Sequence, residues 1–218
     1  MAFKTIGLSD ELQQYVLDHS RTDPIIDDLI AETRSVLSDV ANLQIAPEQA
    51  PFFEVLVRSL NVRSAIEIGT FTGLSALTIA RNLAPGGRLI CCDISEEYTS
   101  IARRYWERAG VADRVDLRIG PAVETLRGLP ADIGFDLAFI DADKVGYPAY
   151  WAEIVPRMRP GGVILVDNVL RGGRVVGDAE RSADDEAMLA FNDMVVRDER
   201  VTVAMLPIAD GITYAVRH

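Results

Sequence analysis

The sequence predicts an α/β protein built on a doubly wound, mostly parallel sheet. From Ser64 onward, short apolar runs alternate five times with stretches of helical spacing, as strands joined by crossover helices do. Most of these runs are nearly unbroken and rich in Ile, Leu and Val, which is typical of parallel strands buried on both faces. Two further apolar runs close the chain, so we expect a sheet of seven strands.

The expected strands fall into a parallel set and a C-terminal hairpin. The parallel set covers 64–69, 87–93, 115–120, 135–141 and 161–168. The last two strands cover 200–208 and 211–218, and only Ala209 and Asp210 separate them. A connection this short, with Gly211 at the turn, predicts an antiparallel hairpin rather than a crossover unit.

Helices are expected between the strands and upstream of them. They cover 9–19, 23–39, 47–60, 73–84, 95–110, 121–129 and 147–158. No repeat, low-complexity segment or linker interrupts the chain, so residues 1–218 are expected to form one domain with the helical segment 1–60 packed on it. The polar, glycine-containing stretch 171–187 predicts a mobile loop beside the C-terminal edge of the sheet.

Composition argues against two classes of partner. Lys and Arg number 22 against 33 Asp and Glu, and no basic block occurs, so nucleic-acid binding is not expected. Neither a signal-peptide core nor an apolar run of about 18 residues occurs, so a membrane partner is not expected. The only cysteines, Cys91 and Cys92, are adjacent in a strand and point to opposite faces. That geometry disfavours a disulfide between them and indicates a reducing, cytoplasmic environment.

The first strand ends in a glycine-containing turn, EIGTFTG, that covers 67–73. Glycines at this point let a ligand approach the backbone, and the following helix offers free N–H groups. The spacing of Gly69 and Gly73, G-x-x-x-G, differs from the dinucleotide fingerprint G-x-G-x-x-G, so a nicotinamide dehydrogenase is disfavoured. A tight structural turn is the alternative interpretation of this loop.

An acid ends the second strand, where doubly wound sheets hold a ribose. Asp93 lies 20 residues after Gly73, and its carboxylate can accept both ribose hydroxyl protons. The third strand ends at Gly120, Pro121 and Ala122, where an adenine ring can lie over the backbone. No lysine follows the glycines as it does in a phosphate-binding loop. These features favour a nucleoside with an amino-acid tail over a nucleotide.

Five motifs, in this order, make the sequence resemble one enzyme family. They are EIGTFTG, DISEEYTSIARRYWERAG, FDLAFIDADK, RPGGVILVDNVL and LPIADGITYAVR. Together they are similar to the cation-dependent S-adenosylmethionine O-methyltransferases, the family of caffeoyl-coenzyme A O-methyltransferase, with catechol O-methyltransferase a more distant relative. The similarity extends from about Leu43 to the C-terminus. It implies an enzyme that uses S-adenosylmethionine and a divalent cation and that forms a homodimer.

The resemblance also implies roles for individual residues. The expected cofactor contacts are Glu67, Gly69, Ser75, Asp93, Ala122 and Asp141. The expected cation ligands are Asp141, Asp167 and Asn168. The expected catalytic residues are Asp141 and Lys144, of which Lys144 matches the family's proposed base. Asp143 lies in the same motif but is not carried over as a ligand.

Elementary chemistry agrees with this ligand set. Two carboxylates and one amide oxygen suit Mg²⁺ best, with Ca²⁺ or Mn²⁺ as alternatives and zinc disfavoured. The only histidines, His19 and His218, lie near the termini, so a histidine-ligated metal is not expected. Asp141 and Asp167 end neighbouring strands, so their side chains can converge at one edge of the sheet. The alternative interpretation is that both aspartates cap the helices that follow them.

The expected reaction is methyl transfer to a hydroxyl of a catechol-type phenol, a small molecule with vicinal hydroxyl groups. A free phenol has a pKa of about 10, and coordination to a cation lowers that pKa and fixes the oxygen. Lys144 lies about one helical turn after Asp141 and can accept the proton, unless it is a solvated surface charge. Two further alternatives are a metal-independent methyltransferase with another small-molecule acceptor and a nucleoside-binding module without turnover. Arg171, after DNVL, either favours an acidic phenol or is solvated.

Overall fold

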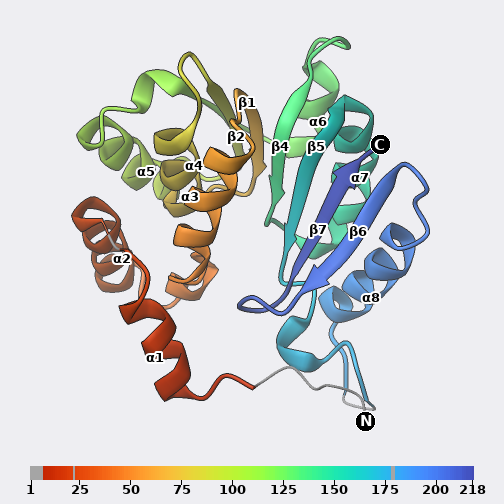
Figure 1. Cartoon of the computed structure of the whole chain (residues 1–218), viewed down its shortest axis with the longest axis horizontal. Helices are drawn as coiled ribbons and strands as arrows, with labels where there is room; N and C mark the ends of the chain where they lie inside the picture. Colours follow the sequence, from red (N-terminus) through yellow and green to blue (C-terminus); the bar gives the residue numbers. More distant parts are fainter. Residues whose placement is uncertain (1–6, 22, 178–179) are drawn as a thin grey trace.

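The computed structural model, which describes residues 7–21, 23–177 and 180–218, is built around one sheet (Figure 1). Within these ranges the sheet has seven strands in the order β3-β2-β1-β4-β5-β7-β6. Their bounds are β1 Ser64–Ile68, β2 Arg88–Asp93, β3 Val115–Ile119, β4 Phe135–Ile140, β5 Met158–Asp167, β6 Val201–Leu206 and β7 Ile212–Arg217. Strands β1 to β5 pair in parallel, and β7 runs antiparallel to both β5 and β6. The predicted fold class is therefore confirmed.

Helices cover both faces of this sheet (Figure 1). In the described ranges the α-helices are α1 Asp10–Asp18, α2 Pro24–Val36, α3 Gln49–Ser59, α4 Leu74–Asn82, α5 Glu96–Arg108, α6 Ala122–Gly128, α7 Tyr147–Ile154 and α8 Ala183–Val195. Residues of α2, α3, α4 and α5 contribute to the core on one face, and residues of α6, α7 and α8 to the core on the other. The first seven helices correspond to predicted segments, with ends that differ by a few residues.

Helix α8 corrects the interpretation of 171–187 as a loop. The side chain of Ser182 accepts a hydrogen bond from the backbone of Asp185, whose side chain accepts one from the backbone of Ser182, so a capping box starts the helix. Met188, Phe191 and Val195 then follow at helical spacing and are buried. The loop prediction is therefore wrong from Ala183 onward, and residues 178–179 of that stretch lie outside the described residues.

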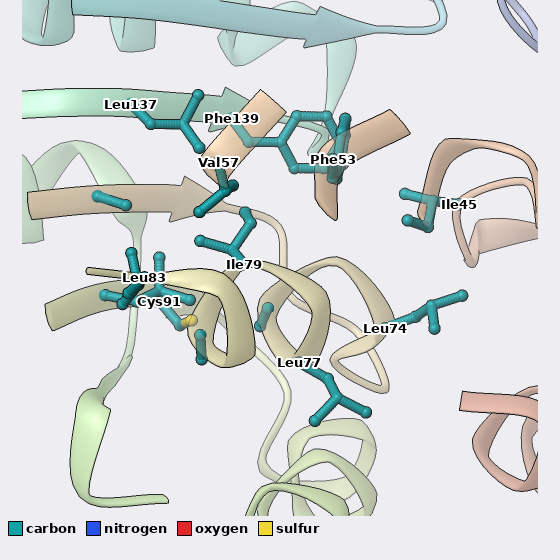
Figure 2. Packing of buried hydrophobic residues seen from close by; sticks show 14 of the residues in the cluster. Ile45, Phe53, Val57, Leu74, Leu77, Ile79, Leu83, Cys91, Leu137 and Phe139 are labelled. Carbon is teal, nitrogen blue, oxygen red and sulfur yellow. The ribbon is translucent and has the colours of Figure 1, made fainter. Parts of the chain in front are cut away.

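The two cores meet the sheet through alternate residues of each strand. Leu137 and Phe139 of β4 face α3, where the ring centroids of Phe139 and Phe53 lie 4.9 Å apart (Figure 2). Ala138 and Ile140 of the same strand belong to the core on the opposite face. Because β4 is buried on both sides, the polar residues that follow it can reach solvent only at the edge of the sheet.

Two observations bear on the expectations drawn from composition. Cys91 and Cys92 are buried in opposite cores, and both are free thiols. Among the residues that the structure describes, no helix is long and apolar enough to cross a membrane.

The strand order places the predicted site residues at one edge. The order reverses between β1 and β4, and ligands bind doubly wound sheets at the carboxyl ends of the strands beside such a switch point. Gly69 follows β1, Asp93 ends β2, Asp141 follows β4 and Asp167 ends β5. The strands β4 and β5 are neighbours, as the convergence of their acids requires.

Candidate active site

A cavity of about 980 Å³ lies at the carboxyl ends of the parallel strands. This volume is at the upper end of the range for small-molecule sites, so a cofactor and an acceptor can share it. The predicted site residues that line it are Gly69, Ser75, Asp93, Ala122, Asp141, Lys144, Asp167 and Asn168. Glu67 is not part of the lining and is fully buried.

The turn after β1 borders the cavity, and its backbone requires glycine at two positions. Gly69 has φ +89°, and a Cβ atom there would lie 1.9 Å from the carbonyl oxygen of Asp141. Gly73 has φ +81°, and its Cβ would lie 2.6 Å from that of Ala102 in α5. Both positions favour glycine because of their left-handed backbone and their close neighbours. The structural-turn interpretation and the binding interpretation are therefore compatible.

Asp93 connects the end of β2 to this glycine turn. Its Oδ2 accepts hydrogen bonds from the backbone of Thr70 at 2.9 Å and of Phe71 at 2.7 Å. Its Oδ1 accepts one from the backbone of Ser95 at 2.8 Å, at the start of α5. The carboxylate is thus held rigidly at the cavity wall, and its remaining lone pairs are available to accept ligand hydroxyl groups.

Glu67 lies beneath the cavity wall as a buried carboxyl group. Its Oε2 accepts a weak hydrogen bond from Cys91 Sγ at 3.5 Å, and within the described part of the chain its buried Oε1 has no hydrogen-bond partner of good geometry. Burial raises the pKa of Glu67 to about 8, although nearby hydroxyl groups of Ser75 and Thr70 favour the ionised form. A buried acid with one unpartnered oxygen is suited to a cationic ligand group, such as the ammonium of an amino-acid tail.

Three side chains with oxygen atoms, those of Asp141, Asp167 and Asn168, lie with Lys144 at the ends of β4 and β5 and line one cavity. The Nζ atom of Lys144 lies 2.9 Å from Asp141 Oδ1 and 2.7 Å from Asn168 Oδ1, so one cation contacts both side chains. The third of these side chains, the carboxylate of Asp167, is 2% exposed and lines the same cavity. Asn168 has φ +58°, a left-handed conformation that asparagine tolerates better than most residues.

The residues at this edge fit a hard divalent cation. Carboxylate and amide oxygens are the ligands that Mg²⁺, Ca²⁺ and Mn²⁺ prefer. Across the residues that the structure describes, no group of three or more His, Cys, Asp or Glu side chains is placed to hold a metal ion. The candidate ligand set therefore depends on the amide oxygen of Asn168 as its third donor.

Lys144 is buried and fully hydrogen-bonded, so the alternative interpretation of it as a solvated surface charge is wrong. It is 8% exposed, and its third hydrogen bond goes to the hydroxyl of Tyr147 at 2.7 Å. The Tyr147 hydroxyl donates in turn to the carbonyl oxygen of Asp167 at 3.2 Å. Burial, followed by the charges of Asp141 and Asp167, raises the pKa of Tyr147 well above its ordinary value. Tyr147 thus stays neutral and holds the Lys144 amine in place.

The surroundings of Asp167 disfavour its ionised form. Burial, followed by repulsion from Asp141, raises the pKa of Asp167 to about 7. A cation between the two carboxylates would remove that repulsion and favour both ionised forms. Asp143, by contrast, is exposed and accepts hydrogen bonds from the backbone of Gly146 and the hydroxyl of Tyr150, so it caps the turn after β4.

Arg171 lines the outer part of the cavity, but its charge is paired. Its Nε donates to Asp185 Oδ1 at 2.9 Å, and its side chain is 17% exposed. The other oxygen of Asp185 accepts from Arg174 at 3.0 Å, so one buried carboxylate at the start of α8 holds two arginines of the 171–182 segment. Arg171 is therefore not freely solvated, and the expectation that it favours an acidic acceptor stays a prediction.

Sequence reasoning missed two side chains at this edge. Tyr147 contacts Lys144, and its position three residues further on at the start of α7 was a signal that helical spacing could have used. Gln49 donates a hydrogen bond to Asp167, which is 118 residues away in the chain, and no local pattern distinguishes it.

Relatives and solved structures resemble the chain over nearly its whole length. A probable caffeoyl-CoA O-methyltransferase of Dictyostelium discoideum is 41% identical and covers 97% of this chain and 94% of its own. The structure of an O-methyltransferase from Bacillus cereus in complex with S-adenosylhomocysteine matches with a TM-score of 0.87 and 31% identity, over 95% of this chain and 97% of that one. The O-methyltransferase TomG of Streptomyces achromogenes, solved with S-adenosylmethionine, gives 0.84 and 28%, over 94% of each chain.

A family model described as O-methyltransferase matches residues 17–218. The match includes the glycine turn, the acid that ends β2 and the cluster at the ends of β4 and β5. The expectation of a methyltransferase enzyme is thereby confirmed: the chain belongs to the O-methyltransferase family of S-adenosylmethionine-dependent enzymes.

Proposed function

We propose that the protein transfers a methyl group from S-adenosylmethionine to one hydroxyl of a vicinal dihydroxyphenol, with a divalent cation, Mg²⁺ by preference, bound to Asp141, Asp167 and Asn168. The observation that carries this proposal is the convergence of these three oxygen donors with Lys144 in one cavity. The name of the Dictyostelium relative supports the acceptor class, because a caffeoyl group carries vicinal hydroxyls on its ring.

The cofactor occupies the part of the cavity bordered by the glycine turn and the end of β2. Asp93 and Ala122 line this part, where Asp93 would accept hydrogen bonds from the ribose hydroxyls and Ala122 would border the adenine. Gly69 and Ser75 border the methionine end, and the Glu67 carboxylate beneath them balances its ammonium group. Asp141 faces both this region and the cation edge, because its carbonyl packs directly against Gly69.

Chemistry at the acceptor hydroxyl has two requirements, a lower pKa for the phenol and a group to receive its proton. A divalent cation held by Asp141, Asp167 and Asn168 would supply the first, because coordination lowers the pKa of a hydroxyl group. The Nζ atom of Lys144 supplies the second, since in its neutral form it can accept the proton of a hydroxyl positioned between Asp141 and Asn168. Tyr147 keeps that nitrogen directed at the edge of the sheet.

A methylation assay with a vicinal diphenol, with and without chelator, tests the proposal. We expect Asp141→Asn to lower turnover by more than about 100-fold and to retain most of its cofactor binding, because Asp93 and the glycine turn are unchanged. Asp143→Asn is the matched control: this exposed residue of the same motif caps a turn, so most of the activity should remain.

Two outcomes would contradict the proposal in different ways. Undiminished turnover after thorough metal removal would favour a metal-independent methyltransferase with another acceptor. Cofactor binding without turnover on a broad panel of phenols, measured by calorimetry and labelled methyl transfer, would favour a nucleoside-binding module.

We further propose that the protein is a cytoplasmic homodimer that uses the exposed apolar face around α1. Leu8, Leu12, Tyr15 and Val16 are 58%, 37%, 60% and 42% exposed, and α1 contributes no buried residue. An apolar face of this kind is a candidate surface for a second copy of the chain. Light scattering after gel filtration should give twice the chain mass for the wild type and a smaller mass for Leu12→Glu/Tyr15→Glu.

A further inference from the structure

The side chain of Gln49 is buried between the N-terminal segment and a proposed cation ligand. It is 1% exposed and begins helix α3. Its Nε2 donates to Asp167 Oδ2 at 2.8 Å, and its Oε1 accepts from the backbone of Ala46 at 2.6 Å. The reversed amide would place donors against the Ala46 N–H and an oxygen against a carboxylate, so both contacts fix a single orientation.

Gln49 supplies the contact that reaches Asp167 from another element. The other oxygen of Asp167, Oδ1, accepts from the backbone of the next residue, Asn168, at 2.6 Å. Each carboxylate oxygen therefore accepts one of these hydrogen bonds and keeps lone pairs for a cation. Without the amide of Gln49, no hydrogen bond from another element would hold Oδ2, and the Asp167 carboxylate could rotate away from the proposed cation position.

Helix α3 is a rigid support for this contact. Phe53 and Val57 of the same helix are buried against β4, as Figure 2 shows. The residue that Gln49 holds on its other side, Ala46, lines the cavity together with its neighbours in 42–46. One amide group thus connects the N-terminal wall of the cavity to the acid at the end of β5.

We propose that Gln49 is a positioning residue of the cation site, which fixes the carboxylate plane of Asp167 before the cation binds. The inference rests on the proposed function, since it assigns Asp167 as a ligand. Groups that hold ligands in place in this way contribute about 10- to 100-fold to metal affinity. Gln49 does not touch the reacting atoms, so its effect should appear in cation binding and not in cofactor binding.

Two binding measurements on the whole chain test this role. Mn²⁺ serves as the probe, and its affinity follows from the free-ion signal in electron paramagnetic resonance. Calorimetry gives the affinity for S-adenosylhomocysteine. We expect Gln49→Met, which preserves side-chain length, to weaken Mn²⁺ binding by about 10- to 100-fold and to leave S-adenosylhomocysteine binding, measured without Mn²⁺, unchanged.

Gln44→Met is the matched control, because Gln44 lines the same cavity but donates to the hydroxyls of Thr33 and Thr72. Its Mn²⁺ affinity should equal that of the wild type. Wild-type Mn²⁺ affinity in Gln49→Met would overturn the inference and leave the proposed function intact. Equal losses of both affinities would also overturn it, since Gln49 would then support the fold and not the carboxylate. A wild type without saturable Mn²⁺ binding would instead refute the cation site itself.

Discussion

Replacing Glu67 by Gln should stabilise the cofactor-free protein, and increasingly so as the pH rises. Glu67 has no exposed surface, and burial raises its pKa from 4.5 to about 8. The unfolded chain releases this proton near pH 4.5 and the folded chain near pH 8. Between these values the folded state holds a proton that the unfolded state has lost, so the free energy of unfolding falls as the pH rises. Glutamine has no proton to lose and removes this dependence.

The raised pKa sets the size of the effect. A tenfold change in proton affinity corresponds to about 1.4 kcal/mol, so the change from 4.5 to about 8 lowers the free energy of unfolding above pH 8 by at most about 5 kcal/mol. For a chain of this length each kcal/mol raises the Tm by about 2 to 4 °C, so about 5 kcal/mol corresponds to a shift of roughly 10 °C or more. We therefore expect the Tm of Glu67→Gln to exceed that of the wild type by roughly 10 °C at about pH 8.5, and by little near pH 5.

Thermal unfolding followed by circular dichroism across this pH range tests the expectation. Glu54→Gln is the control, because Glu54 is an exposed helix residue whose ion pair with Arg58 should contribute little to stability. If Glu67→Gln were less stable than the wild type at both ends of the range, Glu67 would be stabilised as an anion and the burial argument would fail. The same variant should bind S-adenosylmethionine more weakly, since an amide cannot balance the ammonium group of the cofactor.

Two other predictions concern the glycine turn and the lysine. Gly69→Ala should lower the free energy of unfolding by at least about 3 kcal/mol in denaturant titrations, because the strain of a positive φ adds to a clash with the backbone of Asp141. Gly86→Ala is the control, because Gly86 has a similar φ but no atom of the described residues close to the added Cβ. Its free energy of unfolding should fall by only about 1 to 2 kcal/mol. Equal losses would contradict the clash. Tyr147→Phe should lower kcat by about 10- to 100-fold through lost support of Lys144, with unchanged cofactor affinity. Tyr150→Phe, whose hydroxyl contacts the capping turn instead, should retain kcat, and equal kcat values in both variants would refute that support.

The sequence was sufficient to predict the fold and the edge where the site lies. Unbroken apolar runs and alternating helices specify a parallel sheet, and the acids that end the runs must then gather at its carboxyl edge. Asp93, Asp141 and Asp167 do line one cavity in the structure. Helix α8 was missed although its signals are local: Ser182 and Asp185 form the capping box, and a buried apolar face follows. The acidic and glycine-containing residues before it obscured that pattern.

Contacts between distant segments could not be predicted in the same way. Gln49 follows a proline-containing segment with no motif, and only the packing of α3 against β4 brings its amide to Asp167. The burial of Lys144 likewise depends on three elements that meet around it, so spacing could only place it on the correct side of a turn. Sequence patterns describe faces and ends of elements, whereas hydrogen bonds across elements depend on how those elements dock.

The close approach of Gly69 to Asp141 has a thermodynamic consequence. The Asp141 N–H donates to the carbonyl oxygen of Ile68 at 2.8 Å, and the Asp141 carbonyl fills the space where a Gly69 side chain would be. The backbone proposed to receive the cofactor and the backbone that carries the proposed cation ligand Asp141 are therefore in direct contact, so a shift of one should displace the other. Binding of either partner restricts the same few dihedral angles, so each should find the site already ordered by the other. Such heterotropic cooperativity is reciprocal: the factor by which the cation tightens cofactor binding equals the factor by which the cofactor tightens cation binding.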